Sequence, residues 1–87
     1  MNQQYIAQKV KYFRKLNNKS QFEIEIQTGL PHGIICRIEN ERTNPTKETL
    51  WRIAQYLKLN GFEIAELFGI ELPEERMHLN TTITTNV

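Results

Sequence analysis

The side chains best suited to chemistry are few in this sequence. Cys36 is its only cysteine, so neither an internal disulfide nor a cysteine-based metal cluster is possible. His32 and His78 lack the partner ligands that a metal site needs, and a lone cysteine is more often a small packed side chain than a redox sensor. The sequence shows no Ser/His/Asp set, no paired acids of a cleft and no glycine-rich phosphate loop. We therefore expect no enzyme, no metal and no cofactor.

Residues 20–40 instead have the pattern of two short helices around a tight turn. Ser20 offers an N-cap, and Glu23 three residues later completes a capping box. Gly29 ends the first helix, and Gly33–Glu39 predicts the second. This is a helix-turn-helix layout, in which the second helix lies in the major groove of DNA. The apolar positions of the first helix are Phe22, Ile24 and Ile26, and the side chains expected to lock the pair together are Ile24, Leu30, Ile35 and Ile38.

An amphipathic helix is predicted before this pair, over Tyr5–Leu16. Ile6, Val10 and Phe13 give it one buried stripe at the i, i+4, i+7 spacing, and two asparagines at 17–18 end it. Pro31 stands where the first turn of a helix tolerates proline.

Two more helices are predicted after the pair. A loop over residues 40–45 precedes Thr46, which caps a fourth helix, and residues 60–61 break the chain before a last helix, Phe62–Phe68. The fold class is therefore all-α with five helices. The inner positions expected are Leu50, Ile53, Ala54 and Leu57 in the fourth helix, and Phe62, Ala65 and Phe68 in the last.

Composition and charge fit a small soluble domain. The 87 residues are enough for one domain, 39% of them are hydrophobic, and no apolar run reaches the ~20 residues of a membrane helix. The N-terminus has no secretory signal, so we expect a cytoplasmic protein. Residues 1–58 carry ten Lys/Arg and five Glu, a net charge of +5, whereas residues 59–87 carry a net charge of −4. A basic body is a weak sign of a polyanionic partner.

Several short motifs occur together in one order along residues 5–70. On these motifs the chain resembles the lambda-repressor-like, or XRE, family of bacterial and phage regulators, a family of helix-turn-helix DNA-binding domains. One combination of motifs is more specific than a helix-turn-helix pattern alone. It is the run Arg37-Ile38-Glu39-Asn40, followed by an Asn-Pro-Thr loop and a helix that contains Glu-Thr-Leu. The matching residues are Phe13-Arg14, Ser20-Gln21, Gly29-Leu30, Arg37 to Asn40, Asn44 to Thr46, Glu48 to Leu50, Ile53-Ala54, Leu57 and Glu66 to Phe68.

The resemblance implies DNA contacts for particular residues. The counterpart of Gln21 contacts a phosphate and braces the recognition helix, which is the second helix of the pair. Positions equivalent to His32, Gly33 and Arg37 face base edges, and a guanidinium at Arg37 would bond guanine O6 and N7. His32 would donate to guanine or bond a phosphate, while Ile34 would touch a thymine methyl group. The remaining expected contacts are Pro31 at the start of the recognition helix and the phosphate-binding loop residues Asn40, Arg42, Thr43 and Asn44.

The resemblance also implies a buried salt bridge between Arg14 and Glu39, which is structural. The chain departs from the family near the turn: Glu25 replaces the usual alanine and needs an exit to solvent or a cation, so the helix pair would splay slightly. Lys19 and Thr28 stand where apolar residues are common. Ser or Thr usually caps the recognition helix, where this chain has Pro31.

These observations predict a sequence-specific transcriptional regulator that binds double-stranded DNA. We expect a repressor that binds a near-palindromic operator as a homodimer, in the cytoplasm and associated with a bacterial or phage nucleoid. Two alternatives stay open. One is an antitoxin or anti-repressor whose main partner is a protein bound through residues 59–87, and the other is the excised DNA-binding domain of a longer ligand-sensing regulator.

The domain division expected is a DNA-binding domain over residues 1–70 and a tail over residues 71–87. The tail is acidic and then rich in threonine. It is expected to be flexible or to pair with a second copy of itself.

Overall fold

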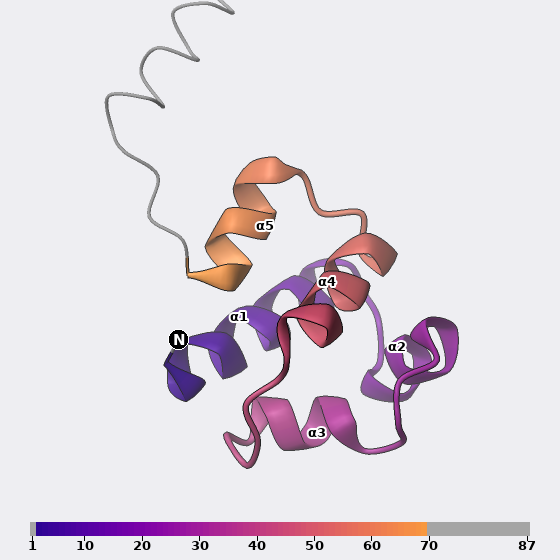
Figure 1. Ribbon diagram of the computed structural model, residues 1–87. Coiled ribbons are helices and arrows are strands. Elements are labelled where there is room, and N and C mark those ends of the chain that lie inside the picture. Colours follow the sequence, from indigo (N-terminus) through magenta and orange to yellow (C-terminus); the bar gives the residue numbers. More distant parts are fainter. Residues whose placement is uncertain (1, 70–87) are drawn as a thin grey trace, which may run out of the picture.

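The computed structural model describes residues 2–69 of the chain, and within this range it contains helices and no strand, which confirms the all-α prediction. The expected tail over residues 71–87 lies outside the described residues. The helices are α1 (Gln3–Leu16), α2 (Gln21–Thr28), α3 (Ile34–Glu39), α4 (Lys47–Tyr56) and α5 (Gly61–Phe68) (Figure 1).

Side-chain caps define where four of these helices begin. Ser20, Thr46 and Asn60 each accept a hydrogen bond from the backbone N–H three residues later, the usual way to satisfy a donor at a helix start. Asn2 does the same for α1, because its Oδ1 accepts the N–H groups of Gln4 and Tyr5 at 2.7 and 3.2 Å. For this reason α1 begins two residues before the predicted start at Tyr5.

One face of each helix forms a single core. The predicted inner residues of α1 and α4 are buried, and the side chains expected to lock α2 to α3 join them, with Leu30 half-buried at the edge. The fully buried side chains are Ile6, Val10, Phe13, Ile24, Ile35, Ile38, Leu50, Ile53 and Leu67.

Three predicted apolar positions face solvent instead. Phe22 and Ile26 are 57% and 60% exposed, because residues two apart in a helix differ by about 200° around its axis and Ile24 takes the inner side. Phe62 is 55% exposed, and the buried residue of α5 is Leu67. α5 begins at Gly61 rather than Phe62, since Asn60 and Glu63 form a capping box there.

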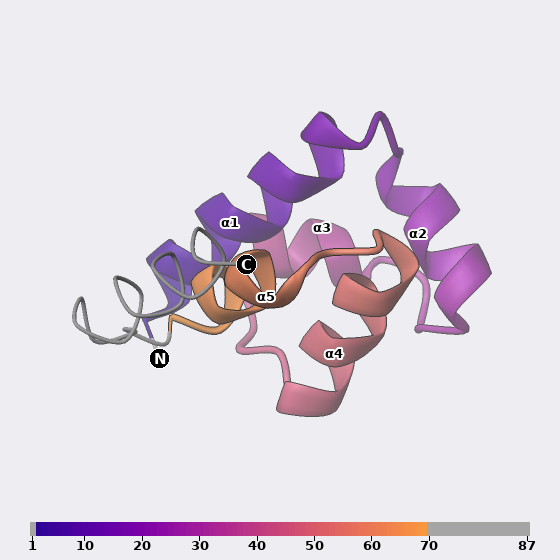
Figure 2. The same cartoon turned by 90° about the horizontal axis from the view of Figure 1, so that it is seen from above.

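The five helices pack in a ring (Figures 1 and 2). α1 packs against α3 and α5, α2 packs against α3 and α4, and α4 also packs against α5. Figure 1 shows α5 and α3 at opposite ends of the view. The fold therefore leaves the outer face of α3 uncovered, at the far side of the molecule from α5.

Candidate nucleic-acid interface

The turn between α2 and α3 is built by local backbone signals. Ser20 and Glu23 form the capping box that starts α2, and Gly29 ends it with φ of +72° in the left-handed region. α3 then begins after Gly33, which has φ of +87°. Both conformations suit glycine, which has no Cβ to clash.

Arg14, Glu39 and Gln21 tie α1, α2 and α3 together. Arg14 donates from Nε and Nη2 to the two carboxylate oxygens of Glu39, at 2.6 and 3.0 Å. Gln21 Nε2 donates to the same carboxylate at 3.0 Å, and Arg14 Nη1 donates to the carbonyl of Lys19 at 3.0 Å. The side chains of Arg14 and Glu39 are 13% and 4% exposed. This network fixes the last turn of α3 against the two helices that precede it.

The hydrogen bonds from Arg14 to Glu39 raise the pKa of the guanidinium above its already high ordinary value, and partial burial opposes this effect. Arg14 is therefore charged at any pH at which the protein is folded.

The exposed face of α3 carries His32 and Arg37 near one end. The His32 side chain is 84% exposed, and Arg37 is exposed as well. A Cβ placed on Gly33 would lie 3.1 Å from Nη1 of Arg37, so the guanidinium reaches back to the start of the helix. The glycine thus leaves room for the cation beside the histidine.

Two residues of the expected DNA-binding set are placed differently from the sequence interpretation. Pro31 lies before the helix rather than in its first turn, and its carbonyl accepts the N–H of Ile34 at 3.2 Å. Gly33, not Pro31, occupies the N-cap position of α3. Ile34 is half-buried and packs against the core, which limits how much of it a thymine methyl could touch.

The loop after α3 brings exposed polar groups to the other end of the helix. Arg42 and Asn44 are exposed and Thr43 is half-buried. Asn40 is exposed as well, and its Nδ2 donates to the carbonyl of Cys36 at 2.8 Å and lies 3.2 Å from its Sγ. The structure thus places His32 just before α3, Arg37 in its last turn with the guanidinium reaching back toward Gly33, and Arg42 and Asn44 beyond its end.

Glu25 has no exit to solvent, one of the two outcomes that the sequence interpretation allowed, because its side chain is 4% exposed. Its Oε2 accepts the N–H of Ile35 at 3.0 Å, and its Oε1 lies 3.3 Å from Nδ1 of His32. The carboxylate therefore joins α2 to the start of α3.

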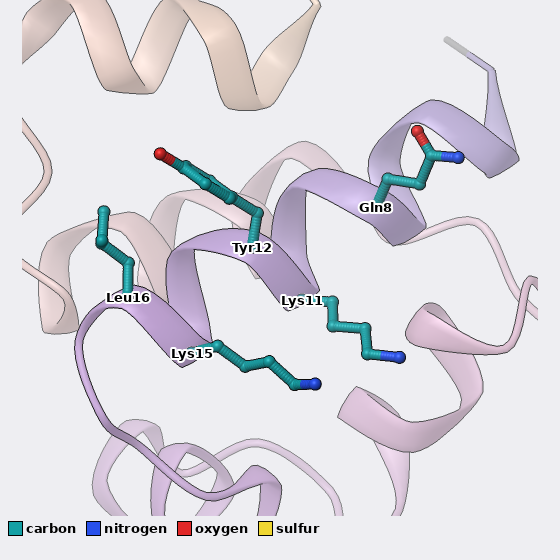
Figure 3. A pocket seen from close by; sticks show the side chains of 5 residues that line it. All are labelled: Gln8, Lys11, Tyr12, Lys15 and Leu16. Carbon is teal, nitrogen blue, oxygen red and sulfur yellow. The ribbon is translucent and has the colours of Figure 1, made fainter.

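A hollow on the outer face of α1 is the other surface feature of note. Tyr12 and Leu16 are 54% and 60% exposed and lie along one side of it, and Figure 3 shows Lys11 and Lys15 pointing away from them on the other. Its lining, completed by Gln8, comes from α1 alone and includes no acid, serine, cysteine or histidine. We interpret it as an exposed apolar strip beside two cations, without the groups of a catalytic site.

Within residues 2–69, no group of three His, Cys, Asp or Glu side chains is arranged to hold a metal ion. The described helices are all too short or too polar to cross a membrane.

Comparison with known proteins adds one match. The model of a helix-turn-helix family matches residues 10–64, which is more than half of the chain and includes α2, α3, α4 and the second half of α1. No curated protein and no solved structure matched the sequence.

Proposed function

The chain belongs to the lambda-repressor-like helix-turn-helix family, and from this premise we propose that it is a sequence-specific transcriptional regulator that binds double-stranded DNA through α3. The observation that carries the proposal is that His32, just before α3, and Arg37, within it, both have exposed side chains. Side chains held in this way on a short, braced helix can be presented to base edges at a defined angle.

Arg37 is the proposed base-reading cation. A guanidinium can donate two hydrogen bonds to O6 and N7 of guanine in the major groove, a contact worth roughly 1–3 kcal/mol of discrimination. Arg42, Thr43 and Asn44 are the proposed phosphate contacts after α3, with Asn40 contributing through the groups it does not use on Cys36. Gln21 is the proposed phosphate contact on α2, and its bond to Glu39 couples that contact to α3.

We further propose that the protein acts as a repressor and binds as a homodimer, in the cytoplasm where bacterial or phage DNA is found. Two copies would place their α3 helices in successive major grooves, about 34 Å apart, on a near-palindromic operator. Occupying such a site within a promoter would exclude the polymerase.

Selection of binding sites from a random double-stranded DNA pool tests the proposal. We expect an enriched motif with two half-sites about one helical turn apart. Arg37→Ala should lose the preference at one base pair of each half-site and weaken binding about 5- to 150-fold. Lys9→Gln is the matched control, because it removes a cation that pairs with Glu66 of α5, away from α3.

An unchanged motif and affinity for Arg37→Ala would show that α3 is docked in another register. If the wild-type chain enriched no motif at moderate salt, the DNA-binding proposal would be wrong.

A second candidate function is the binding of a protein partner, as an antitoxin or anti-repressor does. The observation that favours it is the exposed apolar strip of Tyr12 and Leu16 beside Lys11 and Lys15 (Figure 3). Loss of a captured partner in Tyr12→Ser/Leu16→Ser, with DNA affinity unchanged, would support this function.

A further inference from the structure

The start of α3 has no cap of its own, and Glu25 supplies one from α2. Gly33 occupies the N-cap position and has no side chain to accept a backbone N–H. The Ile34 N–H bonds to the carbonyl of Pro31, and the Ile35 N–H donates to Oε2 of Glu25 at 3.0 Å. A carboxylate is stabilised at the N-terminal end of a helix, because the unpaired N–H groups and the helix dipole both give that end a partial positive charge.

The second oxygen of the same carboxylate faces the proposed base-reading histidine. Oε1 of Glu25 lies 3.3 Å from Nδ1 of His32. The rings of His32 and Phe22 pack edge to face, with their centroids 5.6 Å apart. The His32 side chain remains 84% exposed. With Nδ1 turned to Glu25, Nε2 is the nitrogen left for a ligand.

The contact with Glu25 favours one tautomer of the neutral His32 ring. A carboxylate only accepts hydrogen bonds, so the proton is favoured on Nδ1. In the neutral ring Nε2 is then a hydrogen-bond acceptor. The major groove offers donors to an acceptor at two places, the N6 amino group of adenine and the N4 amino group of cytosine.

Among the described residues, the charged group in contact with this ring is Glu25 from α2. Arg37 lies on α3, with its guanidinium close to the backbone of Gly33. Arg37 only donates, whereas His32 in this state accepts. The start of α3 would thus present one donor and one acceptor to neighbouring base pairs.

Resting on the proposed DNA-binding function, we propose that Glu25 is a positioning residue for base recognition: it caps α3 and holds His32 with Nδ1 protonated, so that Nε2 selects an adenine or cytosine amino group at one base pair. The sequence resemblance implied guanine or phosphate for His32. The contact with Glu25 changes that expectation.

Glu25→Gln tests the proposal without changing the size of the side chain. The Ile35 N–H needs an acceptor, so the amide oxygen should take the place of Oε2 and leave the amide NH2 facing Nδ1 of His32. Nδ1 then becomes the acceptor, the proton moves to Nε2, and Nε2 becomes a donor. Site selection should show adenine or cytosine at one position for the wild type. In Glu25→Gln guanine and thymine should gain there over cytosine by about fivefold or more, as expected for one neutral hydrogen bond, while adenine, whose N7 is an acceptor, is tolerated by both.

Nitrogen chemical shifts of the His32 ring in the free protein, at a pH at which they show the ring to be neutral, test the same proposal without DNA. We expect a proton on Nδ1 in the wild type and on Nε2 in Glu25→Gln. His32→Ala is the control, because it should remove the preference at that base pair equally in the wild-type and Glu25→Gln backgrounds.

The outcomes separate the two proposals. A wild-type chain that selects a motif unchanged by Glu25→Gln would overturn the role of Glu25, as would a wild-type ring with its proton on Nε2, and either result leaves the DNA-binding function standing. A wild-type chain that selects no motif would overturn the proposed function and this role with it. The ring measurement on the wild type stands even if Glu25→Gln does not fold.

Discussion

Two glycines at the turn between α2 and α3 differ in what surrounds their missing side chains. Gly29 has φ of +72° and nothing within 4 Å of an added Cβ, whereas a Cβ on Gly33, at φ of +87°, would lie 3.1 Å from Nη1 of Arg37. Both positions need glycine for the backbone. Only at Gly33 would an added Cβ also crowd another side chain, the guanidinium of Arg37.

Alanine substitutions separate these two requirements. Gly29→Ala and Gly33→Ala should each lower the free energy of unfolding by about 1–2 kcal/mol, because an L side chain is strained in the left-handed region. Gly33→Ala alone should also blur the base preference attributed to Arg37, since the guanidinium must move. Urea unfolding measures the first effect and site selection the second. An equal loss of preference in Gly29→Ala would mean that stability, and not crowding of Arg37, causes it.

At the scale of elements, one ionic network holds the proposed recognition helix in place. Glu39 accepts hydrogen bonds from Arg14 of α1 and Gln21 of α2, and its side chain is 4% exposed. Arg14→Met should therefore lower the free energy of unfolding by about 3–5 kcal/mol, because it leaves a buried carboxylate without its cation. The urea midpoint measures the loss.

The double variant Arg14→Met/Glu39→Met controls for the loss of packing. Replacing both partners of a buried pair by apolar groups removes the uncompensated charge, so the double variant should be more stable than Arg14→Met alone. If the loss in the double variant equalled the sum of the losses in Arg14→Met and Glu39→Met, the two side chains would contribute to stability independently.

The sequence predicted most elements because their signals are local. The apolar spacing of Ile6, Val10 and Phe13 gave α1, and the Ser20–Glu23 box gave the start of α2, since both depend on residues within one or two turns. Errors at helix starts had equally local causes. The Asn2 cap extended α1, and the Asn60 cap began α5 one residue early.

Contacts between distant residues could not be predicted in this way. The Arg14–Glu39 pair spans 25 residues, and only the resemblance to a family pointed to it. Glu25 accepts a hydrogen bond from Ile35, ten residues later in the chain. The local sequence showed Glu25 only as an unusual acid near the turn, so the burial of its carboxylate could not be predicted. Ile34 faced DNA in the sequence interpretation, but its packing depends on how α3 is set against the core.

At the scale of the whole molecule, charge is divided along the chain and across the fold. Residues 1–58 carry a net charge of +5 and residues 59–87 a net charge of −4. Glu66 on α5 pairs with Lys9 on α1. Figure 1 shows α5 at the end of the view opposite to α3. The acidic side chains of α5 are therefore remote from the proposed DNA-binding helix, so they repel DNA phosphates least where contact with DNA is proposed.

The salt dependence of binding tests that division. Each phosphate that a cation neutralises contributes about −0.9 to the slope of log affinity against log salt. Arg42→Ala should therefore weaken binding about equally on all sequences and reduce the slope by about 0.9, because the proposed contact of Arg42 is a phosphate. Lys9→Gln, which removes an equal charge beside α5, should leave the slope unchanged. Fluorescence anisotropy between roughly 50 and 200 mM salt measures both. A slope unchanged by Arg42→Ala, with a shifted base preference, would mean that the loop after α3 reads bases and that the phosphate contacts are made elsewhere.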